Sequence, residues 1–205
     1  MNVKKVFIFW DNSNIFISAK AVAVEKEGAD ASYKLRISFD RLLRLAKAER
    51  EVEYAIAVGS IPPQLRHVWN KLAQTGVKIE LFERGSQSEK EQAVDQALQV
   101  HMLRKAFDYN GVAGTAVLLT GDGKGFLDGV GFHADLERMH RKGWNIEVLA
   151  WEQTCNPRLK EWAKKIGIFI SLEDFYENIT FLDDEHGVIR QSKPLDLKKR
   201  QISPS

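Results

Sequence analysis

The sequence predicts a single α/β domain whose central sheet is mainly parallel and lies between two layers of helices. Short apolar runs rich in β-branched and aromatic residues alternate along the chain with amphipathic segments, whose apolar residues recur every three or four positions. Such alternation indicates a parallel sheet covered by helices on both faces. The chain has 205 residues, and its hydrophobic content of 44% is ordinary for a soluble globular protein.

The expected elements follow directly from these two periodicities. We expect strands at residues 6–10, 52–58, 77–82, 115–120, 145–151 and 168–172, and helices at 39–48, 64–74, 90–107, 135–142 and 158–165. Residues 17–37 are expected to form a polar excursion between the first strand and its helix. The apolar periodicity fades near residue 180, so we predict a domain over residues 1–180 and a flexible C-terminal tail over residues 181–205.

Composition limits the classes of protein that need to be considered. The formal net charge of +2 is too small to argue for nucleic-acid binding by itself. With Cys155 as the single cysteine, no disulfide framework can form, and a reducing compartment fits. No apolar stretch approaches the roughly 20 residues of a membrane span. We therefore expect a cytoplasmic protein without a membrane partner.

Two carboxylates follow strands of the expected sheet. Asp11 ends the apolar run VFIFW, and Asp122 follows TAVLLT within the sequence GDGKG. Ligands of open parallel sheets bind beyond the carboxyl ends of the strands. If these two strands are neighbours, about 4.8 Å apart, both carboxylates face one small volume. Like charges at that distance favour a neutralising cation, and a hard dication with oxygen ligands is the usual solution.

A third carboxylate, Asp95, lies on the long helix expected over residues 90–107, between Val94 and Ala97. Each of the three acids also has an ordinary structural interpretation. An aspartate after a strand often caps a helix or forms an Asx turn, an Asp-Gly pair often forms a plain turn, and a helical aspartate often faces solvent. The functional interpretation therefore depends on the three acids together.

Taken together, these residues resemble the NYN domain family, a branch of the PIN-like nucleases. The resemblance covers roughly residues 3–172. It rests on a strand followed by D-x-x-N (Asp11 and Asn14), a helix with V-D (Asp95), and a strand followed by T-G-D-G (Asp122). It implies a Rossmann-like, PIN-like three-layer sandwich.

The same resemblance implies a function. Asp11, Asp95 and Asp122 would be catalytic residues that hold Mg²⁺ or Mn²⁺ and cleave RNA as a metal-dependent endoribonuclease. Asn14 would orient Asp11 or contact a phosphate, and Lys90 and Lys124 would bind the substrate. RNA is the expected partner, with a homodimer as a possible assembly.

Two positions keep alternatives open. Members of the family often have acids where this chain has Lys124 and His101. A second hypothesis is therefore a binding module of the same fold that holds RNA or a protein without cleaving it. A haloacid-dehalogenase-like phosphatase is less favoured, because that chemistry needs acids where Ser13 and Phe126 stand.

Overall fold

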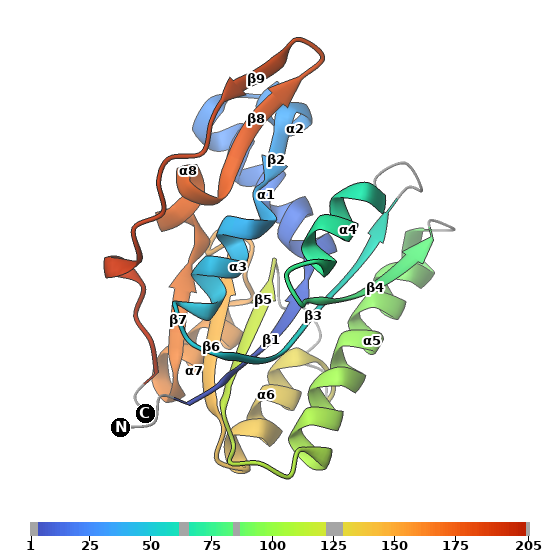
Figure 1. The fold of residues 1–205 in the computed structure, drawn as a ribbon, viewed down its shortest axis with the longest axis vertical. Coiled ribbons are helices and arrows are strands. Elements are labelled where there is room, and N and C mark those ends of the chain that lie inside the picture. Colours follow the sequence, from blue (N-terminus) through green and yellow to red (C-terminus); the bar gives the residue numbers. More distant parts are fainter. Residues whose placement is uncertain (1–3, 62–65, 84–86, 122–128, 204–205) are drawn as a thin grey trace.

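The fold is built on a six-stranded parallel sheet, as the sequence predicts (Figure 1). The computed structural model describes residues 4–61, 66–83, 87–121 and 129–203. The strands are β1 (Val6–Asp11), β3 (Val52–Ile61), β4 (Lys78–Glu83), β5 (Thr115–Thr120), β6 (Asn145–Ala150) and β7 (Ile168–Ser171). Their order is β4-β3-β1-β5-β6-β7, and every neighbouring pair is parallel. All six strands confirm sequence-based expectations.

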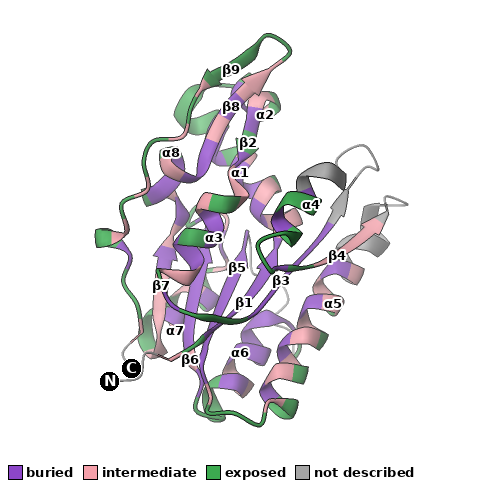
Figure 2. Ribbon diagram, in the orientation of Figure 1, coloured by how far each residue is buried: buried purple, intermediate pink, exposed green. Residues whose placement is uncertain are grey.

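Helices cover both faces of this sheet. The first face packs against α1 (Asn12–Glu27), α3 (Phe39–Lys47) and α4 (Arg66–Ala73), and the second against α5 (Gln87–Asp108), α6 (Phe132–Arg141) and α7 (Pro157–Ile166). Alternate residues of β1 point to opposite faces. Ile8 and Trp10 belong to the first core, whereas Phe7 and Phe9 belong to the second. All four are fully buried, which places β1 in the middle of a three-layer sandwich (Figure 2).

Residues 17–37 differ from the expected polar excursion, and that prediction was wrong. Helix α1 begins directly after β1, and its buried residues Ile15, Ala19 and Ala23 recur every four positions. The helix was missed because three of its five buried residues, Ser18, Ala19 and Ala23, are small. In addition, Ile17 and Val24 lie on its exposed side, which blurs the contrast between the two faces.

A second, antiparallel sheet extends from the same end of the molecule as the C-terminal part of α1 (Figure 1). It has the order β2-β8-β9. The remaining elements are α2 (Ala31–Lys34), β2 (Leu35–Ile37), η2 (Leu172–Phe175), α8 (Tyr176–Ile179), β8 (Thr180–Asp184), β9 (Gly187–Arg190) and η3 (Leu197–Lys199). Because β8 pairs with β2, the chain after residue 180 contributes to the folded structure instead of continuing as an unstructured tail.

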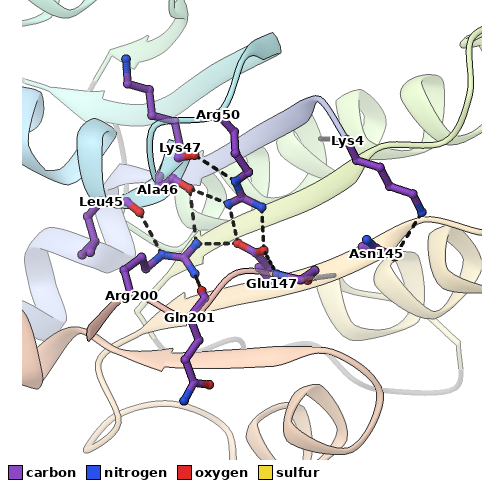
Figure 3. Close-up of polar contacts among 10 residues, drawn as sticks. Lys4, Leu45, Ala46, Lys47, Arg50, Asn145, Glu147, Arg200 and Gln201 are labelled. Carbon is purple, nitrogen blue, oxygen red and sulfur yellow. Dashed lines mark hydrogen bonds and ion pairs between the residues drawn. The ribbon is translucent and has the colours of Figure 1, made fainter. Parts of the chain in front are cut away.

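The last described residues are fixed by a buried ion-pair cluster (Figure 3). Arg50 contacts Glu147 of β6 through two parallel bonds of 2.7 and 2.8 Å, and Arg200 contacts the same carboxylate. The backbone N–H of Ser203 donates to Glu147 Oε1 at 2.8 Å, and Arg200 Nε donates to the carbonyl oxygen of Leu45 at 2.9 Å. The segment expected as a flexible tail thus packs against the domain up to residue 203. No local pattern indicates this packing, because the partners are far apart in the chain.

Burial alone would raise the pKa of Glu147, but the hydrogen bond from Arg50 and the charges of Arg200 and Arg50 outweigh it and lower that pKa below its ordinary value. Glu147 and the guanidinium of Arg200 are both fully buried. A buried charge is tolerated only when it is paired and hydrogen-bonded, as here.

In the described part of the chain, no helix combines the length and apolar character that crossing a membrane requires.

Candidate functional site

Asp11 is the last residue of the central strand β1 and the N-cap of α1. Its Oδ1 accepts a hydrogen bond of 3.0 Å from the backbone N–H of Asn14, which satisfies one of the free donors at the helix start. The residue is fully buried. The sequence suggested two roles for Asp11, a helix cap and a metal ligand, and the structure shows that it is a cap. A carboxylate has further lone pairs, so the cap does not prevent it from binding a cation.

Asn14 also holds the second oxygen of Asp11. Its Nδ2 donates to Asp11 Oδ2 at 2.5 Å, so both carboxylate oxygens are fixed by one residue of the first helical turn. Asn14 is half-buried. This contact is consistent with the expected orienting role, which follows from the D-x-x-N spacing: residues three positions apart meet at a helix N-terminus.

The carboxyl end of β5 lies beside that of β1. Trp10 pairs with Leu119, so Asp11 and Thr120 occupy the next positions of adjacent strands. Gly121 then packs directly on the first turns of α1. A Cβ added there would stand 2.1 Å from the carbonyl oxygen of Asn14 and 2.4 Å from Ser18 Oγ, so only glycine fits.

Asp122 and Lys124 lie outside the described residues. What the structure supplies is the position of the residue before Asp122. The carbonyl oxygen of Gly121 accepts a hydrogen bond of 2.8 Å from Thr154 Oγ1, and Gly121 is buried. The chain therefore leaves β5 from a point fixed against α1, close to where Asp11 ends β1.

Asp95 lies on α5, the helix that packs against β1 and β3 on the second face of the sheet. Its neighbour Val94 is buried in the second core, whereas Asp95 is half-buried. One turn further on, Gln99 Oε1 accepts a hydrogen bond of 3.2 Å from the backbone N–H of Gly131, which joins α5 to the start of α6. Lys90 belongs to α5, but its side chain lies outside the described residues.

The side chains at this edge offer oxygen donors that suit a divalent cation. In the described ranges, no three Asp, Glu, His or Cys side chains gather as a metal site would require, and the expected set cannot be completed because Asp122 is outside those ranges. The buried Oδ1 of Asn12, next to Asp11, has no hydrogen-bond partner among the described residues. Carboxylate and amide oxygens are the donors that Mg²⁺ and Mn²⁺ prefer, so the chemistry of this edge fits such an ion.

His101, at a position where an acid was considered from the sequence, does not lie at the carboxyl edge of the sheet. Its Nδ1 lies 2.8 Å from the hydroxyl of Tyr54, and its Nε2 lies 2.8 Å from Glu80 Oε2. Tyr54 and Glu80 are each the third residue of a strand, β3 and β4 respectively. His101 therefore faces the amino ends of the strands, whereas Asp11 ends β1 at its carboxyl end.

Sequence reasoning overlooked the buried carboxylate of Asp135, in the first turn of α6. Its Oδ1 pairs with Arg138 at 2.7 Å, and Arg138 also donates to the carbonyl oxygen of Gly129 at 2.6 Å. Burial raises the pKa of Asp135, and the hydrogen bond and charge of Arg138 oppose that rise without cancelling it. The sequence signal was an acid near the start of an amphipathic helix, which does not distinguish a buried carboxylate from a solvated one.

The parallel sheet, its covering helices and a carboxylate at the end of the central strand define a PIN-like, nuclease-type fold. The chain belongs to the NYN domain family, whose model matches residues 5–172.

One solved structure similar to this chain is a protein of unknown function from Vibrio parahaemolyticus. The TM-score is 0.57 at 16% sequence identity, over 92% of this chain and 99% of that one, so this likeness shows the fold alone. No match was found among curated proteins.

Proposed function

We propose that the protein is a metal-dependent endoribonuclease acting at the carboxyl edge of its sheet. The observation that carries the proposal is the placement of Asp11, buried at the end of the central strand with both oxygens fixed by Asn14, near Gly121, which follows β5. Membership of the NYN family supports a nuclease over the phosphatase considered from the sequence. Cytoplasmic location and a homodimer stay predictions.

Asp11, Asp95 and Asp122 would hold the cation, Mg²⁺ or Mn²⁺. A bound divalent ion lowers the pKa of its water and neutralises charge that grows on the phosphoryl oxygens. The contribution of this chain is positional. Asn14 keeps the Asp11 carboxylate in one orientation, which a cation ligand requires, and the packing of Gly121 on α1 holds the two strand ends together. Lys90 and Lys124 would bind substrate phosphates.

The test is cleavage of labelled single-stranded RNA and DNA in Mn²⁺, Mg²⁺ or EDTA by the wild type and Asp11→Asn. Asparagine remains a good N-cap, so the variant should fold while its cleavage is abolished. Asp40→Asn is the matched control, since Asp40 is an exposed aspartate in the first turn of α3 and the change removes the same charge. Cleavage that persists in Asp11→Asn, or in EDTA, would contradict the proposal.

A binding module without cleavage is the second candidate, and the feature that favours it is Lys124, two residues after Asp122, where the family often has an acid. His101 does not bear on this choice, because it is hydrogen-bonded to Tyr54 and Glu80, away from Asp11. RNA that is bound in the same assay but remains intact with either metal would support this candidate.

A further inference from the structure

A basic cavity of about 290 Å³ lies near the amino ends of the strands, away from Asp11. It is found between the C-terminal half of α5 and the first residues of β3 and β4. It is lined by Tyr54, Lys78, His101, Arg104, Lys105 and Asp108. Three cations and the carboxylate of Asp108 give these side chains a charge of +2 when His101 is neutral, and Glu80, which contacts His101, lowers the local charge to +1. Small-molecule pockets span about 300–1,000 Å³, so this cavity suits a small charged group.

The cations are gathered around one aromatic ring. Lys105 Nζ lies 4.3 Å from the centroid of the Tyr54 ring, and Lys78 Nζ lies 5.1 Å from the same centroid. Neither lysine, nor Arg104, forms an ion pair of 4.0 Å or less with any residue in the part of the chain that the structure describes. The ring attracts both ammonium groups and holds them at the cavity, and an anion that enters the cavity would be attracted to the cations that line it.

The floor of the cavity is a fixed polar chain. Glu80 accepts from His101 Nε2, so the neutral ring carries its proton on Nε2, and the hydroxyl of Tyr54 donates to Nδ1. Glu80 is therefore engaged by the histidine, and Asp108 is the carboxylate among the lining residues. Tyr54 is buried, with 7% of its surface exposed, and its ring stays in place as a platform beneath the two lysines.

We infer that this cavity binds a phosphate group, and that the phosphate belongs to the RNA strand outside the point of cleavage. The two ammonium groups and the guanidinium of Arg104 supply the donors that phosphate oxygens require. Asp95 and Arg104 are nine residues apart on α5, about 14 Å along its axis and half a turn around it, so a strand that reaches both places must cross the helix. The inference rests on the proposed function for its ligand, but its test measures binding and not cleavage.

The test is fluorescence anisotropy of a labelled single-stranded RNA, in EDTA, at several salt concentrations. The variant Arg104→Gln/Lys105→Gln removes two cations from the cavity. The control Arg44→Gln/Lys198→Gln removes the same charge from two exposed residues near the C-terminal segment. We expect the cavity variant to bind RNA more weakly, with a salt slope reduced by about 0.7 for each phosphate that it no longer neutralises, and no such change in the control. Equal behaviour of the two variants would overturn the inference.

A second arm identifies the source of the phosphate. Inorganic phosphate and adenosine monophosphate are titrated while the NMR signals of the Tyr54 and His101 rings are followed. Shifts in the wild type that vanish in the cavity variant support a phosphate site. If those shifts occur while RNA affinity is the same in both variants, the ligand is a small nucleotide, and the RNA assignment is overturned.

Thermal melting of each variant checks that it is folded. Asp11→Asn should retain the salt slope of the wild type. Loss of cleavage and loss of phosphate binding are therefore measured separately, and failure of one proposal can be told apart from failure of the other.

Discussion

Two fully buried carboxylates lie at opposite ends of the sheet and accept hydrogen bonds from different kinds of donor. Glu147, near the start of β6, is held by the guanidinium groups of Arg50 and Arg200 and by the backbone N–H of Ser203. Asp11, at the end of β1, is held by the backbone and side-chain amides of Asn14. Charged donors make Glu147 a structural anchor, whereas the amides of Asn14 orient Asp11, which we propose as a cation ligand. The comparison indicates that burial alone does not reveal the role of a carboxylate and that its donors must be known as well.

The largest expected effect comes from breaking the anchor. Glu147→Gln removes the charge that two buried arginines share, and leaving such charges uncompensated costs about 3–5 kcal/mol. Urea denaturation should show this loss in the free energy of unfolding. The control is Glu53→Gln, since Glu53 forms only a surface ion pair with Lys5, and its removal should cost at most about 1 kcal/mol. A loss below about 1 kcal/mol in Glu147→Gln would mean that the cluster is not an anchor.

Acid should weaken the same anchor in the wild type. Because the pKa of Glu147 in the folded protein lies below its ordinary value of 4.5, its contribution is complete above that pH. It is lost as the pH falls below 4.5 toward the lowered folded value, because the unfolded chain then binds the proton more readily. The melting temperature, measured from neutral to acidic pH, should fall more steeply with decreasing pH for the wild type than for Glu147→Gln. Parallel curves would contradict the assignment.

At the other end of the sheet, Gly121→Ala should separate β5 from α1. The added Cβ meets the carbonyl oxygen of Asn14 and Ser18 Oγ, and backbone cannot move aside as freely as a side chain can. We expect a loss of about 1–3 kcal/mol, typical of overpacking, together with reduced cleavage because the strand ends shift. Unfolding and cleavage are measured on the same preparation. A variant as stable as the wild type would show that this contact is loose.

The smallest expected change in the free energy of unfolding comes from two substitutions of Asp11, which separate its role as an N-cap from its charge. Asp11→Ala removes the N-cap and should cost about 1 kcal/mol, whereas Asp11→Asn keeps an accepting oxygen and should change the free energy of unfolding by only a few tenths. Both should lose cleavage to the same extent, because both lose the carboxylate. If the two variants unfolded alike, Asp11 would contribute through something other than its cap.

Much of the fold could be predicted from the sequence, because a strand or a helix imposes its own period on the residues that it contains. All six strands of the main sheet were visible, as was the abrupt end of the first one at Asp11. One exception is α1, whose buried side carries several small side chains and gives little contrast. The other is the second sheet, in which β8 pairs with β2 from a distant part of the chain.

The candidate site was predictable only as a set of residue types at strand ends. The roles of Asp11 as a cap and Asn14 as its holder follow from the way that α1 begins directly after β1. Asp135 and His101 were not interpretable, because the burial of the first and the partners of the second depend on which helices and strands pack beside them.

The sequence by itself determined the six strands of the main sheet, most of the helices that cover it and the presence of acids after its strands, since these are local patterns. Only the tertiary structure decided the strand order, which brings the ends of β1 and β5 together, and the pairing of Glu147 with arginines 97 and 53 residues away. The physical reason is that backbone and side-chain preferences act over a few residues, whereas strand pairing and buried ion pairs form between segments whose proximity exists only in the folded chain.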